Sequence, residues 1–115
     1  MVNIEALVIG WLNRQALGAA AFADIPADRP HRFITVERTG GGRDRFVDRP
    51  QTVVQVWADS RAEASELADT VATALQGMIA LPEVGRVTVE SVVNFPDVSG
   101  HPRYQIFITA VTKHD

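Results

Sequence analysis

The stretch Gln51-Thr52-Val53-Val54-Gln55-Val56-Trp57-Ala58-Asp59-Ser60-Arg61-Ala62-Glu63 places a strand pattern directly before the start of a helix. Residues 51–58 are rich in β-branched and aromatic side chains, which favour a β-strand. Ser60 and Glu63 match a capping box, in which the serine hydroxyl accepts from the Glu63 N–H and the glutamate carboxylate accepts from the Ser60 N–H. An apolar stripe with the 3.6-residue period of a helix follows and continues toward Ala80. We therefore expect a strand followed by a long helix.

Outward from this stretch, the sequence predicts one more helix and three more strands. The apolar spacing of residues 4–16 is typical of an amphipathic helix with Asn3 as its N-cap, and the alanine-rich residues 19–25 are expected to form a short extended piece. The remaining strand patterns occupy residues 33–39, 86–93 and 104–111. The predicted fold class is α/β of the α+β kind: two helices pack on one face of a mainly antiparallel sheet of about four strands, in the order helix, strand, strand, helix, strand, strand. Residues 1–115 are expected to form a single domain.

Both faces of the predicted sheet carry apolar side chains. Ile106 and Phe107 lie on opposite faces of the last strand, and Val56 and Trp57 lie on opposite faces of the second. Two short helices can cover only one face of such a sheet. Either a loop of the same chain or another copy of the chain would cover the second face, and we favour another copy.

Composition excludes several classes of protein. The 115 residues include 46% hydrophobic and 22% charged residues, as in an ordinary globular domain. The absence of cysteine removes disulfides, thiolate metal sites and cysteine nucleophiles. No apolar run approaches the ~20 residues of a membrane span and no secretion signal opens the chain, so we expect a cytoplasmic, unprocessed protein without a membrane partner. A net charge of −3 argues against a general nucleic-acid binder.

The sequence lacks a coherent set of catalytic or metal-binding residues. His31, His101 and His114 have none of the spacings typical of metal ligands. The glycines Gly40-Gly41-Gly42 do not open a helix and no Gly-Lys-Ser/Thr follows them, so a flexible hairpin loop is favoured over a phosphate-binding loop. We therefore expect no catalytic residues, no cofactor and no metal, in a protein that is not an enzyme.

Charge is unevenly distributed along the chain. Six of the eleven basic residues lie in the first predicted hairpin and its entry: Arg29, Arg32, Arg38, Arg43, Arg45 and Arg49. The long helix and the residue before its cap instead carry acidic side chains: Asp59, Glu63, Glu66 and Asp69. Three interpretations are open: two ordinary solvated surfaces, complementary contacts between neighbouring subunits, and a nucleic-acid site, which the interleaved acidic residues disfavour.

Four passages are informative when taken together. They are Arg32-Phe33-Ile34-Thr35-Val36-Glu37-Arg38-Thr39-Gly40-Gly41, then Asp48-Arg49-Pro50, then Val54-Gln55-Val56-Trp57-Ala58 leading into Ser60-Arg61-Ala62-Glu63-Ala64, and finally Gly100-His101-Pro102-Arg103-Tyr104. In this order the passages resemble the tail terminator proteins of long-tailed, siphovirus-type phages, especially actinobacteriophages. The resemblance extends from about Pro30 to Thr112, and none of its passages is a catalytic signature.

The resemblance implies a structural virion protein at the head–tail junction, assembled in the cytoplasm of the bacterial host. In that family a small α/β subunit forms a hexameric ring, which caps the head-proximal end of the tail tube, ends tube polymerisation and provides the docking surface for the head. The implied partners are other copies of the chain, the major tail tube protein and a neck or head-completion protein, with the tape measure protein as a further candidate. Genomic DNA would pass through the lumen without sequence-specific binding.

Charge and pattern also select residues for the expected subunit or tube contacts: Arg38, Arg43, Arg45, Arg49, Trp57, Glu63, Glu66 and Phe107. For Trp57 and Phe107, burial in the core of one subunit is an equally open interpretation. Two other functions are kept as alternatives. One is a head-completion or neck protein of the same particle. The other is a small cytoplasmic oligomeric enzyme or ligand-binding protein with a ferredoxin-like sheet, in which Asp97 and His101 would line a pocket at a subunit interface.

Overall fold

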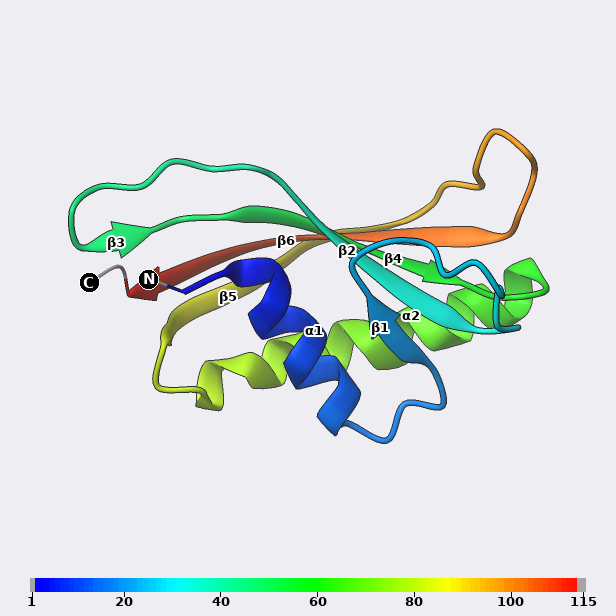
Figure 1. The fold of residues 1–115 in the computed structure, drawn as a ribbon, viewed down its shortest axis with the longest axis horizontal. Coiled ribbons are helices and arrows are strands. Elements are labelled where there is room, and N and C mark those ends of the chain that lie inside the picture. Colours follow the sequence, from blue (N-terminus) through cyan, green and yellow to red (C-terminus); the bar gives the residue numbers. More distant parts are fainter. Residues whose placement is uncertain (1, 114–115) are drawn as a thin grey trace.

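The computed structural model describes residues 2–113 and has a mixed α+β fold, in which two α-helices lie on one face of a single sheet (Figure 1). His114, one of the three histidines considered above, lies outside the described residues. The elements, in chain order, are α1 (Ile4–Arg14), β1 (Ala20–Phe22), β2 (Phe33–Gly40), β3 (Val47–Asp48), β4 (Gln51–Trp57), α2 (Arg61–Gln76), the 3₁₀ turn η1 (Gly77–Ala80), β5 (Val84–Asn94) and β6 (Arg103–Lys113).

The sheet is built around β6. β4 pairs with the first part of β6, β3 pairs with its last residues, and β5 pairs with almost its whole length on the opposite side. β2 pairs antiparallel with β4, and β1 adds to β2 as the one parallel pair of the described sheet. β5 and β1 therefore lie at the two edges of the sheet, and the short β3 also pairs with one strand only, β6.

The prediction of about four strands and of a simple helix, strand, strand, helix, strand, strand order was wrong, because the described sheet has six strands. The two additional strands are very short. β1 lies within residues 19–25, which the sequence predicts to be extended, and it is a strand because it pairs with β2. On its other side, Asn13 Oδ1 accepts from the Ala21 N–H at 2.8 Å, and Asn13 Nδ2 donates to the Ala21 carbonyl at 3.1 Å. β3 pairs through only Val47 and Asp48. A hydrophobic pattern carries no signal for strands of two or three residues.

The predicted helix starts are confirmed. Asn3 accepts from the Ala6 N–H, and the Ser60 hydroxyl accepts from the Glu63 N–H at 3.2 Å. Helical structure after Ser60 extends to Ala80, with η1 as the final turn. The helices and the facing side of the sheet enclose one core, whose buried members include Val8, Leu12, Ile34, Val36, Val54, Val56, Leu67, Val71, Leu75, Met78, Ile106 and Ile108.

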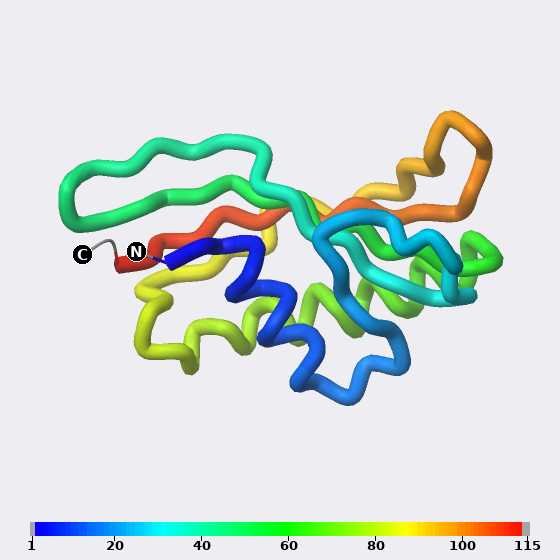
Figure 2. Tube along the Cα trace, viewed as in Figure 1, coloured from blue at the N-terminus to red at the C-terminus, as the bar shows by residue number. Residues whose placement is uncertain are grey.

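The molecule is elongated, with principal extents of 42 × 27 × 25 Å. The connection between β2 and β4, residues 38–51, extends beyond the helices at one end; we call it the arginine arm (Figure 2). The β5–β6 loop, residues 95–102, projects at the opposite end, which is also where α2 begins (Figure 1). The four arginines of the arm, Arg38, Arg43, Arg45 and Arg49, are thus separated along the long axis from the start of α2, whereas Arg29 and Arg32 lie close to it.

Candidate interaction surfaces at the two ends of the sheet

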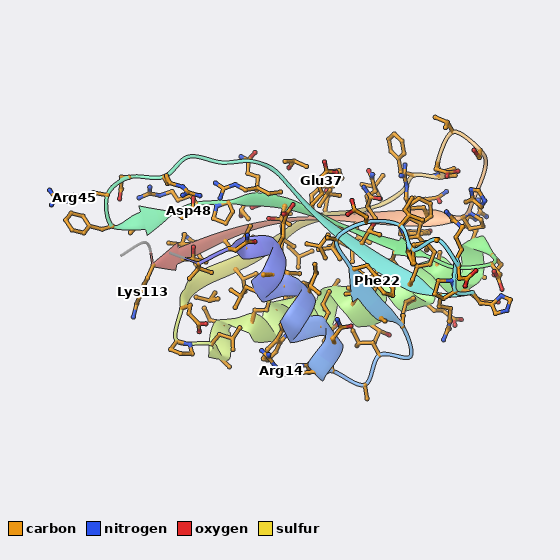
Figure 3. The ribbon with its side chains drawn as sticks, viewed as in Figure 1. Arg14, Phe22, Glu37, Arg45, Asp48 and Lys113 are labelled. Carbon is orange, nitrogen blue, oxygen red and sulfur yellow. The ribbon has the colours of Figure 1, made fainter. Side chains whose placement is uncertain are left out.

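The arginine arm is organised around the carboxylate of Asp48. Arg38, at the end of β2, donates from Nη1 to Asp48 Oδ2 at 2.7 Å and from Nη2 to Asp48 Oδ1 at 2.9 Å. The same guanidinium donates to the carbonyl oxygens of Gly40 and Gly41, each at 2.9 Å. Arg43 adds a second ion pair to Asp48, with Nη2 3.3 Å from Asp48 Oδ2. Figure 3 shows Asp48 within the arm rather than at its tip.

Asp48 is almost inaccessible to solvent, with 1% of its side chain exposed. The hydrogen bonds from Arg38 hold the pKa of Asp48 below its ordinary value, because they stabilise the ionised carboxylate. The same bonds raise the pKa of Arg38. Both partners are therefore charged over the physiological range, and this pair fixes the base of the arm.

Two of the three consecutive glycines, Gly41 and Gly42, contribute to the backbone structure of the arm. Gly41 has φ +93°, and a Cβ built on it would lie 2.1 Å from the carbonyl oxygen of Arg49, so no side chain fits. The Gly42 carbonyl accepts from the Arg49 N–H at 2.9 Å, which closes the arm across its width. The structure thus gives this segment a defined hydrogen-bonded conformation, and its expected flexibility stays a prediction.

The tip of the arm is a turn stabilised by Asp44. Its Oδ1 accepts from the N–H groups of Phe46 at 2.8 Å and Val47 at 2.9 Å, and these bonds lower the pKa of Asp44. Arg49 reaches the other carboxylate oxygen at 3.3 Å. The turn leaves Phe46 70% exposed beside Arg45, whose guanidinium carbon lies 5.8 Å from the centre of the phenyl ring. Figure 3 shows Arg45 at the outermost point of the arm.

The four arginines predicted for subunit or tube contacts therefore differ in their surroundings. The Arg38 guanidinium donates hydrogen bonds to Asp48 and to two backbone carbonyls, so within one chain Arg38 stabilises the arm. Arg43 and Arg49 pair with Asp48 and Asp44 of the same arm. Arg45 alone of the four projects beyond the arm without an ion pair to any described residue.

The outer face of the sheet, away from the helices, is covered around Trp57 by the same chain. The Trp57 and Phe33 rings stack with centres 5.4 Å apart. Arg29 lies 5.0 Å and Arg103 lies 5.1 Å from the centre of the indole ring, and the indole N–H donates to Thr35 Oγ1 at 3.1 Å. Only 2% of Trp57 is exposed. Of the two coverings considered for this face, the loop that carries Arg29 is found at Trp57. Coverage of the remaining face by a second copy stays a prediction.

Phe107 lies on the same outer face and is half-buried. It stands opposite Val53 of β4 on one side and Ser91 of β5 on the other. Its part in a subunit contact stays a prediction, because the single chain leaves some of the ring accessible.

Acidic residues gather where α2 begins. The Glu63 carboxylate lies 3.9 Å from Arg32 Nε, and Asp59 Oδ2 lies 2.7 Å from His31 Nδ1, so the loop before β2 is tied to this end of α2. Glu66 and Asp69 are exposed on the next two turns. Exposed apolar side chains on β5 and the β5–β6 loop lie toward the same end: Val92, Val93, Phe95 and Val98.

Asp97 and His101, considered for a ligand pocket, stabilise the β5–β6 loop instead. Asp97 Oδ1 accepts from the N–H groups of Ser99 and His101, and the His101 Nδ1 lies 3.0 Å from Asp97 Oδ2. Burial alone would raise the pKa of Asp97, but the hydrogen bonds from His101 lower it below its ordinary value. Within residues 2–113, no cluster of three or more potential metal ligands occurs.

The chain matches no protein-family model and no curated protein. Among the described residues, neither helix has the length and apolar character that crossing a bilayer would require.

Proposed function

We propose that this chain is a structural, non-catalytic subunit that assembles head to tail into a ring and serves as the tail terminator of a long-tailed phage. The sequence resemblance described above supports the assignment to a phage tail. The structural support is the placement of unlike surfaces at opposite ends of one elongated subunit.

The observation that carries the proposal is the opposition of the arm tip and the start of α2. Arg45, with the Phe46 ring beside it, forms a cationic and apolar tip at one end (Figure 3). Helix α2, which carries the exposed carboxylates of Glu66 and Asp69, begins at the other end (Figure 1). A head-to-tail contact joins two different patches of neighbouring copies, and such contacts generate a closed ring when the rotation between subunits closes. A six-membered ring is the size that the resemblance implies.

The proposed ring sits on the head-proximal end of the tail tube within the virion. There it ends the addition of tube subunits and offers its free face to a neck or head-completion protein. DNA crosses the lumen, and a chain with a net charge of −3 suits a conduit that does not retain its cargo.

The direct test is to incubate the purified protein with purified tail tubes and image the products by negative-stain electron microscopy. We expect a ring at one end of each tube, and no further growth when tube subunits are added. A matched control replaces Ile79, an exposed residue of η1 outside both surfaces, with alanine, and should cap tubes normally. Tubes that stay uncapped, or continue to grow with the protein present, would rule out the terminator function. Binding to isolated heads instead would favour the neck alternative.

A further inference from the structure

An open groove of about 510 Å³ lies between the first turns of α2 and the neighbouring ends of β5 and β6. It is lined by Arg61, Ala62 and Ser65 from α2, Asn94 from β5 and Tyr104 from β6. Small side chains on the helix and a partly buried aromatic ring on the sheet leave space for an inserted side chain. By volume the groove admits a phenyl ring, for which about 150 Å³ is enough in an enclosed apolar cavity. The groove itself is open to solvent, and Arg61, Ser65 and Asn94 make most of its lining polar.

One rim of the groove is acidic. Ala62 lies three and four residues before Ser65 and Glu66, and Asp69 lies four and three residues after them, so all four share one face of α2. Ala62 and Ser65 line the groove, which places the exposed carboxylates of Glu66 and Asp69 along the same side. Arg61 also lines the groove, so a cation fits only on the side of Glu66 and Asp69, and the apolar group of a ligand would enter beside Ala62 and Tyr104.

The tip of the arginine arm has this combination. Phe46 is 70% exposed, the greatest exposure of any described phenylalanine, and Arg45 is held beside its ring by a cation–π contact. The Asp44 turn and the Arg38–Asp48 pair fix the backbone that carries both residues. A preorganised tip loses little conformational freedom on binding, which favours association.

The tip and the groove of one chain cannot meet. The arm extends from one end of the long axis, and α2 begins at the other (Figures 1 and 3). The complementary shapes and charges can therefore be satisfied only between two copies of the chain.

We infer that Phe46 and Arg45 of one copy insert into the groove between α2, β5 and β6 of the next copy, with Arg45 pairing with Glu66. This inference rests on the proposed ring, for which it names the subunit contact. The contact is heterologous, so each copy uses its tip once and its groove once. Phe46 is the apolar anchor, and the Arg45–Glu66 pair sets the orientation.

Cysteine crosslinking tests the contact directly, because the natural chain contains no cysteine. Arg45→Cys retains Phe46, and Ser65→Cys lies in the groove. Under mild oxidation at high protein concentration, and again on tail tubes, the double variant should form a covalent ladder that ends at the closed ring. Each single variant alone should remain uncrosslinked, and a mixture of the two should stop at a dimer. Self-crosslinking of Arg45→Cys alone would show a symmetric contact and overturn the inference, as would absence of a ladder in both conditions.

A charge exchange between the two proposed partners, without cysteine, tests the contact independently. Arg45→Glu should weaken association measured by sedimentation, and adding Glu66→Arg to the same chain should restore it. Phe46→Ala should weaken association about 30-fold, as expected for a central aromatic anchor, and the Ile79→Ala control should not. Failure of the charge exchange to restore assembly would count against the Arg45–Glu66 pairing.

The same variants separate this inference from the terminator function. A covalent ring that does not cap tubes would leave the contact standing and rule out the function. Tube capping by a double cysteine variant that never crosslinks would leave the function standing and rule out the contact.

Discussion

Asp48 and Arg38 form a two-pronged ion pair, with hydrogen bonds of 2.7 and 2.9 Å, at a carboxylate of which only 1% is exposed. The pair joins the end of β2 to β3, ten residues later, and so fixes the width of the arginine arm at its base. A buried charge that loses its partner is costly, because the remaining charge stays desolvated. The exposed tip is therefore supported by a pair whose carboxylate is buried and whose arginine is only 23% exposed.

Asp48→Asn should lower the free energy of unfolding by about 2–3 kcal/mol, because it removes the charge that compensates the partly buried Arg38. Urea unfolding at neutral pH, followed by circular dichroism, measures the change. Asp44→Asn is the control: its side chain is 55% exposed, so its loss should affect stability much less. Equal stability of Asp48→Asn and the natural protein would show that the pair does not stabilise the fold.

The free energy of unfolding should also depend on pH, because Asp48 titrates differently in the folded and unfolded chains. Its pKa is lowered in the folded protein, so below the ordinary aspartate value the unfolded chain binds more protons than the folded one. The contribution is fully present above about pH 4 and is lost as pH falls through the lowered folded value. Urea unfolding at pH 7, 4 and 3 should show that the free energy of unfolding falls steeply with pH in the natural protein and less steeply in Asp48→Asn. Parallel losses in both proteins would assign the acid sensitivity to other carboxylates.

Gly41 should tolerate no side chain, whereas Gly42 should accept one. Gly41→Ala places a Cβ 2.1 Å from the Arg49 carbonyl oxygen in a left-handed conformation, so we expect a loss of about 2 kcal/mol or more. Gly42→Ala is the matched control, because nothing lies within 4 Å of its Cβ position. Thermal unfolding of both variants measures the contrast. A similar melting temperature for the two would mean that the arm does not hold Gly41 as the structure shows.

The parts of this fold that the sequence predicts are those with local causes. The Ser60 cap, the apolar stripe of α2 and the β-branched runs of β2 and β4 each act within a few residues, and all four are found where the pattern indicates. Strand β1 pairs with β2 on one side, and Asn13 bonds to Ala21 on the other. Such contacts leave no periodic signal, which is why a sheet of about four strands was expected.

The candidate surfaces likewise depend on contacts that a local sequence pattern does not predict. An excess of arginine in the first hairpin is visible in the sequence, but which arginine is internal and which is free depends on Asp48 and Asp44. The sequence also marked the outer sheet face as too apolar without indicating that Arg29 and Arg103 enclose Trp57. No sequence pattern distinguishes Phe46, the most exposed phenylalanine described, because a single aromatic residue in a loop has no periodicity.

Trp57 should behave as a core residue. It is 2% exposed, stacks on Phe33 and donates its indole N–H to Thr35 Oγ1 at 3.1 Å, so Trp57→Ala should lower the free energy of unfolding by about 3–5 kcal/mol. Trp57→Phe is the matched variant: it retains an aromatic ring against Phe33 and loses the hydrogen bond, so its loss should be smaller. Trp11, whose indole N–H bonds to the Ala74 carbonyl at 2.7 Å, remains as a fluorescent reporter of unfolding in both variants. If Trp57→Ala instead left the melting temperature unchanged and reduced only self-association in light scattering, Trp57 would belong to a subunit contact, and the enclosure by Arg29 and Arg103 would not persist in solution.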